Sequence, residues 1–252
     1  MSQSNHVQSL ARGLAVIRSF DVDNPDQTLS EVAKRTDLTR ATARRLLLTL
    51  TDLGYATTDG KRFSLTPAVL EIGYAYLSSL NIQQIAQPFL ETLSETAKES
   101  VSVSVLDGTD VVYIARVPTA RIMTISLGLG TRLPAHCTSM GRVLLAELTN
   151  TEVERRLPAT LDALTERTIT SRDDLLAELT LVRAQGYALV DQELEIGVRS
   201  VAAPLRDSTG RATAAMNIST HAGRTTLEEV REHFLPKLLS AAADVNNALR
   251  KR

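Results

Sequence analysis

The stretch SEVAKRTDLTRATARRLLLTLTDLGYATTDGKRFSL, residues 30–65, predicts two short helices followed by two short strands. Just before it, Thr28 and Glu31 have the spacing of a capping box, in which each side chain satisfies a free backbone N–H at a helix start. After a Thr-Asp-Leu break, Thr39 is placed to cap a second helix, which Gly54 stops. The stretch therefore predicts a helix-turn-helix.

Further elements flank this helix pair. After it, two strand-like runs surround a tight Asp59-Gly60 turn, which predicts a wing. Before it, residues 10–20 place apolar side chains at the spacing of an amphipathic helix, at Leu10, Leu14 and Ile17. After the wing, Thr66-Pro67 predicts the start of a linker helix over 67–79, whose apolar stripe is Leu70, Tyr74 and Leu77. We place a domain boundary near residue 80, so that residues 1–80 form a winged helix-turn-helix.

The second helix of the pair has two unlike faces. The apolar side is expected to bury Thr39, Ala43, Leu46, Leu50 and Leu53. The opposite side carries Arg40, Arg44 and Arg45, and arginine can donate twice to guanine or to a phosphate. A solvated arginine face on an ordinary amphipathic helix, or a protein-interaction module, is the alternative. The residues expected to contact DNA are Thr39, Arg40, Thr42, Arg44, Arg45, Lys61 and Arg62.

Composition limits the possible classes of protein. The 252 residues, 43% hydrophobic and 23% charged, are enough for two domains with their own cores. The net charge of −1 gives no overall argument for nucleic acid, and residues 1–80 hold nine basic and eight acidic side chains. One such domain should therefore bind DNA weakly, and two or more copies are needed. With one cysteine, no export signal and no run near the ~18 apolar residues of a membrane span, we expect a cytoplasmic protein without a membrane partner.

The second half of the chain, residues 81–252, alternates strand-like and helical segments. Residues 101–105 and 111–117 form a hairpin around an Asp-Gly-Thr-Asp turn. Further strands are predicted at 123–127, 187–193, 201–205 and 212–219, and helices at 138–148, 172–185 and 226–250. The fold class is therefore α/β with two domains: a mostly helical winged helix-turn-helix and an α+β domain with a mainly antiparallel sheet.

A helix start in the second half is suited to an anion. His136, Cys137, Thr138 and Ser139 precede the predicted helix, whose free N–H groups favour a carboxylate. Arg116 and Arg132 flank this region, and either could pair with a ligand carboxylate. The alternatives are that Ser139 is a plain N-cap and that the arginines form surface ion pairs.

An enzyme is the competing hypothesis for the same segment. The pair His136 and Cys137 at a helix start suggests a thiol- or metal-dependent hydrolase, with His221 as a further metal ligand. Adjacent residues rarely serve as nucleophile and base, however, and neither a G-x-S-x-G elbow nor a paired metal-ligand motif is present. We therefore expect no catalytic residues, no metal and no cofactor.

Several stretches resemble the IclR family of bacterial transcriptional regulators. QSLARGLAVIRSF, LSEVAKRTDLTRATARRLLLTLTDLGY and FSLTPAVLEIGYAYL resemble its winged helix-turn-helix. LPAHCTSMGRVLLAEL, VRAQGYALVDQELEIGVRSVAAPL and AAMNIST resemble its effector-binding domain. Within the family, ARGLAVIRSFD and TRATARR are most similar to the branch that controls breakdown of protocatechuate and related aromatic acids.

The resemblance implies operator DNA and a small organic acid, aromatic or keto, as partners, and a homodimer or tetramer. It also implies pocket residues, here Thr138, Ser139, Met140, Asp191, Glu193, Ser200, Asn217 and Ser219. To these we add His136 and Arg116 from the helix start and its flanks. Relatives carry a small residue in place of Met140 and serine in place of Asn217, so this pocket should have its own shape.

Overall fold

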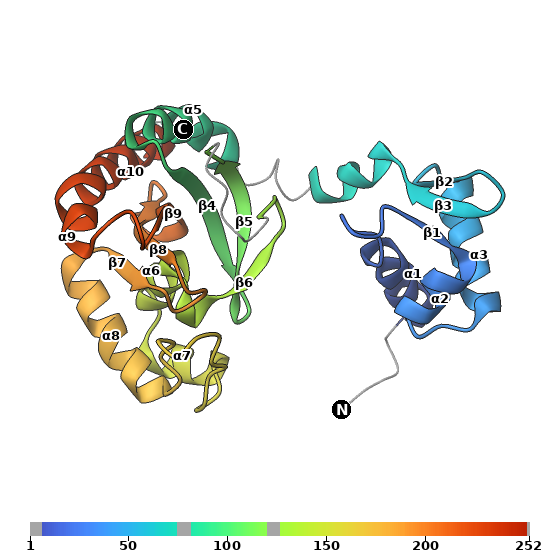
Figure 1. The fold of residues 1–252 in the computed structure, drawn as a ribbon, viewed down its shortest axis with the longest axis horizontal. Coiled ribbons are helices and arrows are strands. Elements are labelled where there is room, and N and C mark those ends of the chain that lie inside the picture. Colours follow the sequence, from blue (N-terminus) through green and yellow to red (C-terminus); the bar gives the residue numbers. More distant parts are fainter. Residues whose placement is uncertain (1–6, 75–81, 120–126, 251–252) are drawn as a thin grey trace. The chain divides into compact units, whose positions relative to one another are not determined.

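A computed structural model describes residues 7–74, 82–119 and 127–250 (Figure 1). The chain divides into two compact units, Met1–Ser79 and Leu80–Arg252. Within the described ranges, no helix is both long and apolar enough to cross a membrane.

The first unit contains the predicted helix pair. Its helices are α1 (Gln8–Arg18), α2 (Leu29–Arg35) and α3 (Arg40–Asp52). The capping box at the start of α2 is confirmed, since Thr28 and Glu31 each accept a hydrogen bond from the other's backbone N–H. The Thr39 side chain caps α3 as predicted, and Gly54 beyond its end has φ +82°, a conformation that glycine adopts most readily.

The wing is a three-stranded sheet in the order β1-β3-β2. The predicted hairpin is present as β2 (Ala56–Thr58) and β3 (Arg62–Leu65), with Gly60 in the turn at φ +93°. Strand β1 (Asp26–Thr28) was not predicted, because it lies in the polar break before α2 and forms only by pairing with β3. After the wing a single 3-10 turn leads into helical residues 70–74, and Leu77 lies outside the described residues.

The core of the first unit lies where its three helices meet. Its fully or nearly buried side chains include Val16, Val32, Ala43, Leu47 and Leu50. The predictions of Thr39 and Leu53 as core residues are wrong. Thr39 is the exposed N-cap of α3, and Leu53 follows the last residue of α3 and is 64% exposed. Leu47 takes its place in the core.

The second unit contains a six-stranded sheet, antiparallel throughout, in the order β6-β5-β4-β9-β8-β7. The expected α+β class is therefore confirmed. The strands are β4 (Ser100–Asp107), β5 (Asp110–Val117), β6 (Arg132–Pro134), β7 (Ala188–Asp191), β8 (Val198–Arg206) and β9 (Ala212–His221). Of the strand predicted at 123–127, residues 123–126 lie outside the described residues, and Leu127 is not in a strand. The short strand β6 was not predicted.

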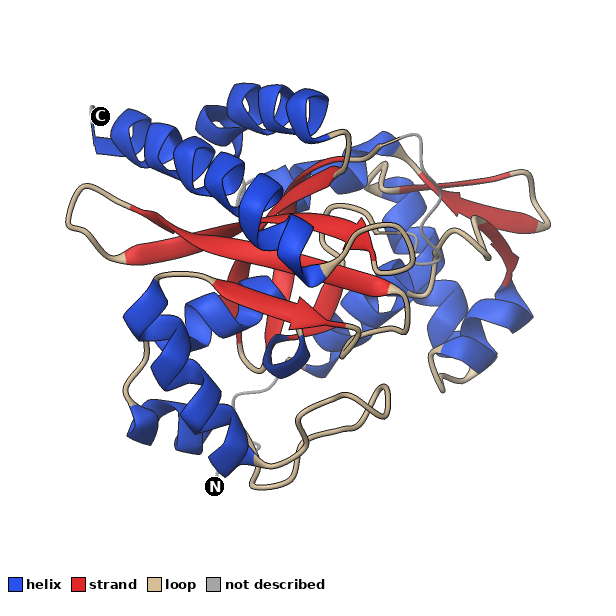
Figure 2. Ribbon diagram, turned by 60° about the vertical axis from the view of Figure 1, so that its left-hand side comes forward, coloured by secondary structure: helices blue, strands red, loops and turns tan. Residues whose placement is uncertain are grey.

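Helices lie on both faces of this sheet (Figure 2). On one face, α5 (Ile82–Ala97) and α10 (Leu235–Arg250) pack against each other and against the strands. On the other face, α6 (Ser139–Ala146) crosses β8 and β9 and packs on α8 (Arg172–Gln185). The small helix α7 (Asn150–Arg156) follows α6. Helix α6 begins over the middle of the sheet, which positions the site described below.

Candidate functional site

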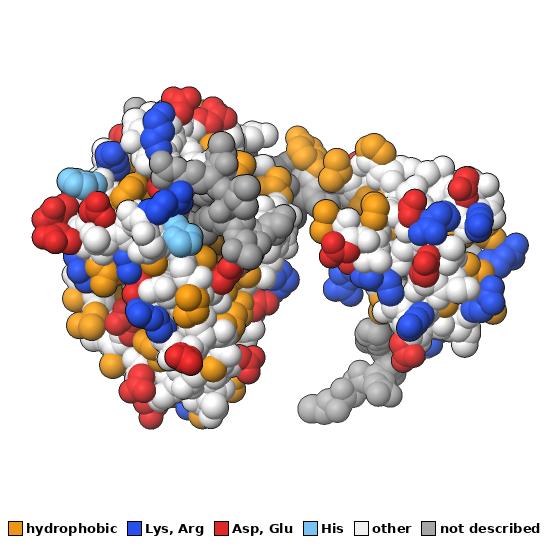
Figure 3. All heavy atoms as spheres, viewed as in Figure 1, with side chains coloured by type: hydrophobic (Ala, Val, Ile, Leu, Met, Phe, Trp, Pro, Cys, Tyr) orange, Lys and Arg blue, Asp and Glu red, His pale blue; other side chains and the backbone are white. Residues whose placement is uncertain are grey.

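The exposed face of α3 carries three unpaired arginines. Arg40, Arg44 and Arg45 are all exposed, and none has an ion-pair partner among the described residues. The small side chain of Ala41 is exposed beside them. Unpaired guanidinium groups on the second helix of a helix-turn-helix are available to phosphates and base edges. Figure 3 shows basic and acidic side chains interspersed over this unit, in line with its near-zero net charge.

The two threonines at the start of α3, Thr39 and Thr42, form the hydrogen bonds that cap this helix. The Thr39 hydroxyl accepts a hydrogen bond from the Thr42 backbone N–H at 3.2 Å, and the two hydroxyls lie 2.9 Å apart. Thr39 is exposed and Thr42 half-buried. Capping does not prevent a phosphate contact, because a hydroxyl group has two lone pairs and one donor.

The two basic residues of the wing differ. Lys61 is exposed at the turn, and its side chain has no partner among the residues that the structure describes. Arg62, also expected to contact DNA, instead holds the wing together: its Nε donates to Asp26 Oδ1 at 2.9 Å, and its guanidinium lies 3.6 Å from Glu31. The sequence could not show this, because Asp26 lies 36 positions away and belongs to the unpredicted strand β1.

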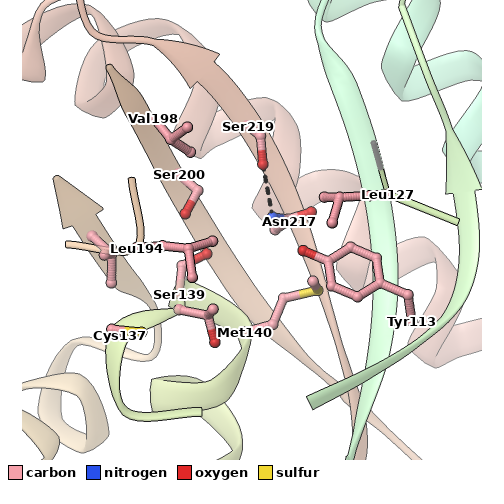
Figure 4. Close-up of a pocket in the computed structure, with 12 residues that line it drawn as sticks. Tyr113, Leu127, Cys137, Ser139, Met140, Leu194, Val198, Ser200, Asn217 and Ser219 are labelled. Carbon is pink, nitrogen blue, oxygen red and sulfur yellow. Dashed lines mark hydrogen bonds between the residues drawn. The ribbon is translucent and has the colours of Figure 1, made fainter. Parts of the chain in front are cut away.

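A small pocket lies in the second unit between the start of α6 and the sheet (Figure 4). Its free volume is about 20 Å³, roughly the space of one water molecule. The lining residues are Tyr113, Leu127, Cys137, Thr138, Ser139, Met140, Val190, Leu194, Val198, Ser200, Asn217 and Ser219. Gly141 allows α6 to start this close to the preceding turn, because a Cβ there would lie 2.1 Å from the Ala135 carbonyl oxygen.

The pocket contains buried polar atoms without partners. Asn217 Nδ2 donates to Ser219 Oγ at 3.0 Å, which leaves Asn217 Oδ1 without a hydrogen bond among the described residues. Ser139 Oγ is likewise buried and unpartnered there. The N-cap of α6 is Thr138, whose hydroxyl accepts from the Gly141 N–H at 3.2 Å, so the alternative that Ser139 is the N-cap is wrong. Leaving such groups unpaired costs about 1–3 kcal/mol each, which a polar ligand would recover.

Four residues expected in the pocket lie outside its lining. Arg116 lines a separate hollow, and partners within the fold take up the polar groups of the other three. Glu193 is buried and accepts from Arg142 Nη2 at 2.5 Å and from the Ile169 N–H at 2.9 Å. Asp191 pairs with Arg167 and with Arg199. The His136 ring, through Nε2, lies 3.0 Å from the Asp162 carbonyl oxygen. The strand segment does reach the pocket, through the neighbouring apolar residues Val190 and Leu194.

The two arginines considered as carboxylate partners have different surroundings. Arg132 is exposed and already forms ion pairs with Asp107 at 2.7 Å and Asp110 at 3.0 Å. Arg116 is half-buried, and its Nε and Nη1 atoms are buried without a partner among the described residues. It lines a separate hollow of about 240 Å³, which shares Leu127 with the pocket. Burial lowers the pKa of Arg116 from its ordinary value.

Cys137 has the environment of a buried thiol. Its Sγ lies 3.6 Å from the Pro134 carbonyl oxygen, and burial, aided by the charge of Glu193, raises its pKa to about 12. The neighbouring His136 ring points to Asp162 instead. The described residues contain no group of three or more His, Cys, Asp or Glu placed to hold a metal. The hydrolase alternative thus finds no support in the geometry, since a reactive cysteine needs a lowered pKa.

Sequence reasoning missed half of the pocket lining. Tyr113, Leu127, Cys137, Val190, Leu194 and Val198 were not predicted as lining residues. Tyr113 lies on β5, and burial raises the pKa of its phenol to about 12, so it stays neutral. Apolar residues that line a ligand pocket follow the same strand alternation as ordinary core residues, and nothing local distinguishes the two.

Comparison with known proteins agrees with both units. The IclR helix-turn-helix domain matches residues 9–60, and the bacterial transcriptional regulator IclR C-terminal domain matches residues 74–247. The chain is 47% identical over 243 residues to the Pca regulon regulatory protein of Pseudomonas putida, covering 96% of this chain and 84% of the relative.

Solved structures give the same result. A transcriptional regulator structure from Rhodococcus sp. RHA1 is 55% identical, with a TM-score of 0.87 over 98% of this chain and 99% of that one. The inducer-binding domain of the Acinetobacter transcription factor PobR, solved as a double mutant with 3-hydroxybenzoic acid, is 34% identical. Its TM-score is 0.61 over 66% of this chain and 97% of that one. From fold, sites and similarity together, the chain belongs to the IclR family of bacterial transcriptional regulators, within the branch that controls aromatic-acid catabolism.

Proposed function

We propose that this regulator binds operator DNA through α3 and the wing, and that a small organic acid in the second unit changes that binding. The observation that carries the proposal is the row of exposed arginines on α3, at Arg40, Arg44 and Arg45, which have no ion-pair partner among the residues that the structure describes. An exposed charge without a partner contributes nothing to the stability of this unit, whereas on DNA it displaces counterions and adds affinity.

The DNA-contacting residues divide into two roles. Arg40 and Arg44 lie in the first turns of α3, and we assign them to base edges in the major groove. Arg45, Lys61 and the hydroxyls of Thr39 and Thr42 suit the phosphate backbone. Arg62 acts indirectly, by fixing the wing that presents Lys61.

The effector is proposed to be an aromatic or keto acid that binds at the start of α6. In support, the unpartnered Ser139 and Asn217 atoms are available to a polar ligand, and relatives regulate aromatic catabolism or were solved with a hydroxybenzoic acid. Thr138, Met140, Ser200 and Ser219 complete the polar and apolar walls. The acid can change operator affinity only if it binds two states of the regulator with different affinity.

A salt-dependent electrophoretic mobility shift with the promoter of the regulator's own gene tests the DNA half of the proposal. Specific retardation that weakens as salt rises is expected. A thermal-shift screen of carboxylic acids tests the other half, since a ligand at 100 times its Kd adds about 2.7 kcal/mol of stability. If the promoter DNA is not specifically retarded, the proposal that this protein binds operator DNA is refuted. No stabilising acid, or one that leaves operator affinity unchanged, would refute effector control.

A further inference from the structure

A β-bulge turns Arg116 toward the pocket side of the sheet. In the β4–β5 pairing, Tyr113 lies opposite Ser104 but Ala115 lies opposite Val103, so Ile114 is an extra residue. Side chains alternate along a regular strand, where Arg116, three positions after Tyr113, would face away from it. Because the bulge leaves Ile114 out of the pairing, both side chains lie on the face that α6 covers.

Arg116 and Asn217 then flank a short side chain on that face. Arg116 is paired with Ser102 on β4, and Ser102 with Asn217 on β9. Directly paired residues project to the same side of a sheet, and the two outer backbones are roughly 10 Å apart across two strand spacings. The hollow beside Arg116 and the pocket beside Asn217 share Leu127 as a wall.

Arg116 and Asn217, at the two ends of the row Arg116, Ser102 and Asn217, suit different chemical groups of a ligand. Arg116 has two buried donor nitrogens without a partner among the described residues, whereas the buried Arg142 and Arg199 each pair with a carboxylate of the fold. A ligand carboxylate would accept hydrogen bonds from this guanidinium and neutralise its charge. At the other end, Asn217 Oδ1 is an acceptor and repels a carboxylate, but it accepts readily from a hydroxyl.

We infer that the effector is an acid with two polar ends, whose carboxylate binds Arg116 and whose second, neutral oxygen group binds at Ser139 and Asn217. This inference rests on the proposed function and assigns a chemical group to each end of its site. The middle of the ligand is apolar, because Tyr113 and Leu127 line the pocket beside Asn217 (Figure 4) and Leu127 also lines the hollow beside Arg116. Because the pocket itself holds only about 20 Å³ of free space, admitting this ligand requires lining side chains to shift, and Met140 is a flexible one among them.

The test uses isothermal titration calorimetry on the full-length protein with 3,4-dihydroxybenzoate and its neutral analogue 3,4-dihydroxybenzamide. Arg116→Gln is compared with wild type, with Arg132→Gln as matched control, because Arg132 lies on the neighbouring strand and pairs with acidic residues of the fold. We expect Arg116→Gln to weaken binding of the acid roughly 10- to 100-fold and to leave binding of the amide unchanged. Arg132→Gln should match wild type with both ligands, and Arg116→Lys should recover part of the preference for the acid.

The other end is tested with Asn217→Ala and the pair benzoate and 3,4-dihydroxybenzoate. Only the hydroxylated acid should lose affinity. Unchanged acid binding in Arg116→Gln, or equal losses of acid and amide in a variant that unfolds at the wild-type temperature, would overturn the inference while the regulator's response to acids stood. Wild-type protein that binds neither the acid nor the amide would contradict the inference, and failure of every acid in the thermal-shift screen would contradict the proposed function as well.

Discussion

Cys137 and Ser139 lie two positions apart in the wall of one pocket and have opposite chemical properties there. Burial of the Cys137 thiol disfavours its ionised form. The Ser139 hydroxyl is also buried, but it has no hydrogen-bond partner among the described residues. Because the first cannot supply a nucleophile and the second can bind an oxygen group, the segment is suited to ligand recognition and not to covalent chemistry.

The thiol of Cys137 should therefore be inert in the native protein. With its pKa raised from 9.0 to about 12, the thiolate fraction at pH 8 falls by roughly a thousandfold. Because the thiol is also buried, its reaction with Ellman's reagent should be much slower in the native than in the unfolded protein. The raised pKa also means that this thiol stabilises the fold below pH 9 and that its contribution is lost as pH rises from about 9 to 12. Ellman kinetics on native and guanidinium-unfolded protein check this, and equal rates would contradict it.

Arg142 and Glu193 form a buried ion pair in the second unit. Both side chains are buried, and Arg142 Nε also donates to the His136 carbonyl oxygen at 2.9 Å. Arg142→Met should lower the free energy of unfolding by about 3–5 kcal/mol, because it leaves Glu193 charged and buried without its partner. Adding Glu193→Gln should recover part of the loss. Urea unfolding measures both, and a single-variant loss below about 1 kcal/mol would show that the pair is unimportant.

Among its elements, the first unit contains a short helix, α3, and a wing whose strand β3 is joined to β1. The helix buries Ala43, Leu47 and Leu50, which leaves its arginine face outward, and Arg62 ties β3 to β1. The outward face and the wing turn therefore have fixed positions relative to each other within this unit. Recognition by the helix and backbone contact by the wing can thus be tested separately.

Arg40→Ala and Arg44→Ala should each weaken operator binding by about 1–3 kcal/mol and relax preference at particular base pairs. Lys61→Ala should weaken binding to all DNA sequences alike, because it removes a phosphate contact. It should also reduce the slope of log affinity against log salt concentration by about 1. Fluorescence anisotropy with operator and scrambled DNA at several salt concentrations separates these effects. Arg211→Ala, an exposed arginine of the other unit, is the control. If all three variants bind like wild type, α3 does not read DNA.

For the whole molecule, the first unit exposes more apolar surface than one isolated copy needs. Leu10, Leu14, Leu53 and Ile72 line one hollow of about 770 Å³ and are 40–64% exposed. Such a surface is typical of an interaction site. A unit with only one more basic than acidic side chain also needs a second half-site for useful operator affinity.

We therefore predict a homodimer, or a dimer of dimers, in solution. Sedimentation velocity at micromolar concentration should show a species of at least twice the chain mass. Leu10→Ser with Leu53→Ser should weaken operator binding at least about tenfold, since each buried leucine contributes about 1.5–3 kcal/mol. Val22→Ser is the matched control, because Val22 is 85% exposed in the same unit and lies outside the hollow. A purely monomeric protein that still binds its operator would refute the prediction.

The sequence by itself determined the local elements of this protein. The caps at Thr28 and Thr39, the Asp59-Gly60 turn and the helix at 172–185 are readable because a cap, a turn or a helical period is completed within about four residues. Thr138 and Ser139 could be proposed as anion-binding residues because a helix start is also recognised within a few residues, whereas Met140 was proposed from the family resemblance.

Only the tertiary structure decided which groups remain free. Arg62 is taken by a partner 36 positions away and Glu193 by one 51 positions away. One extra residue in β5 turns Arg116 to the pocket face, and a cross-strand register places it level with Asn217. These outcomes depend on strand pairing and packing between distant segments, and a shift of one residue in a strand reverses the side to which its side chains point.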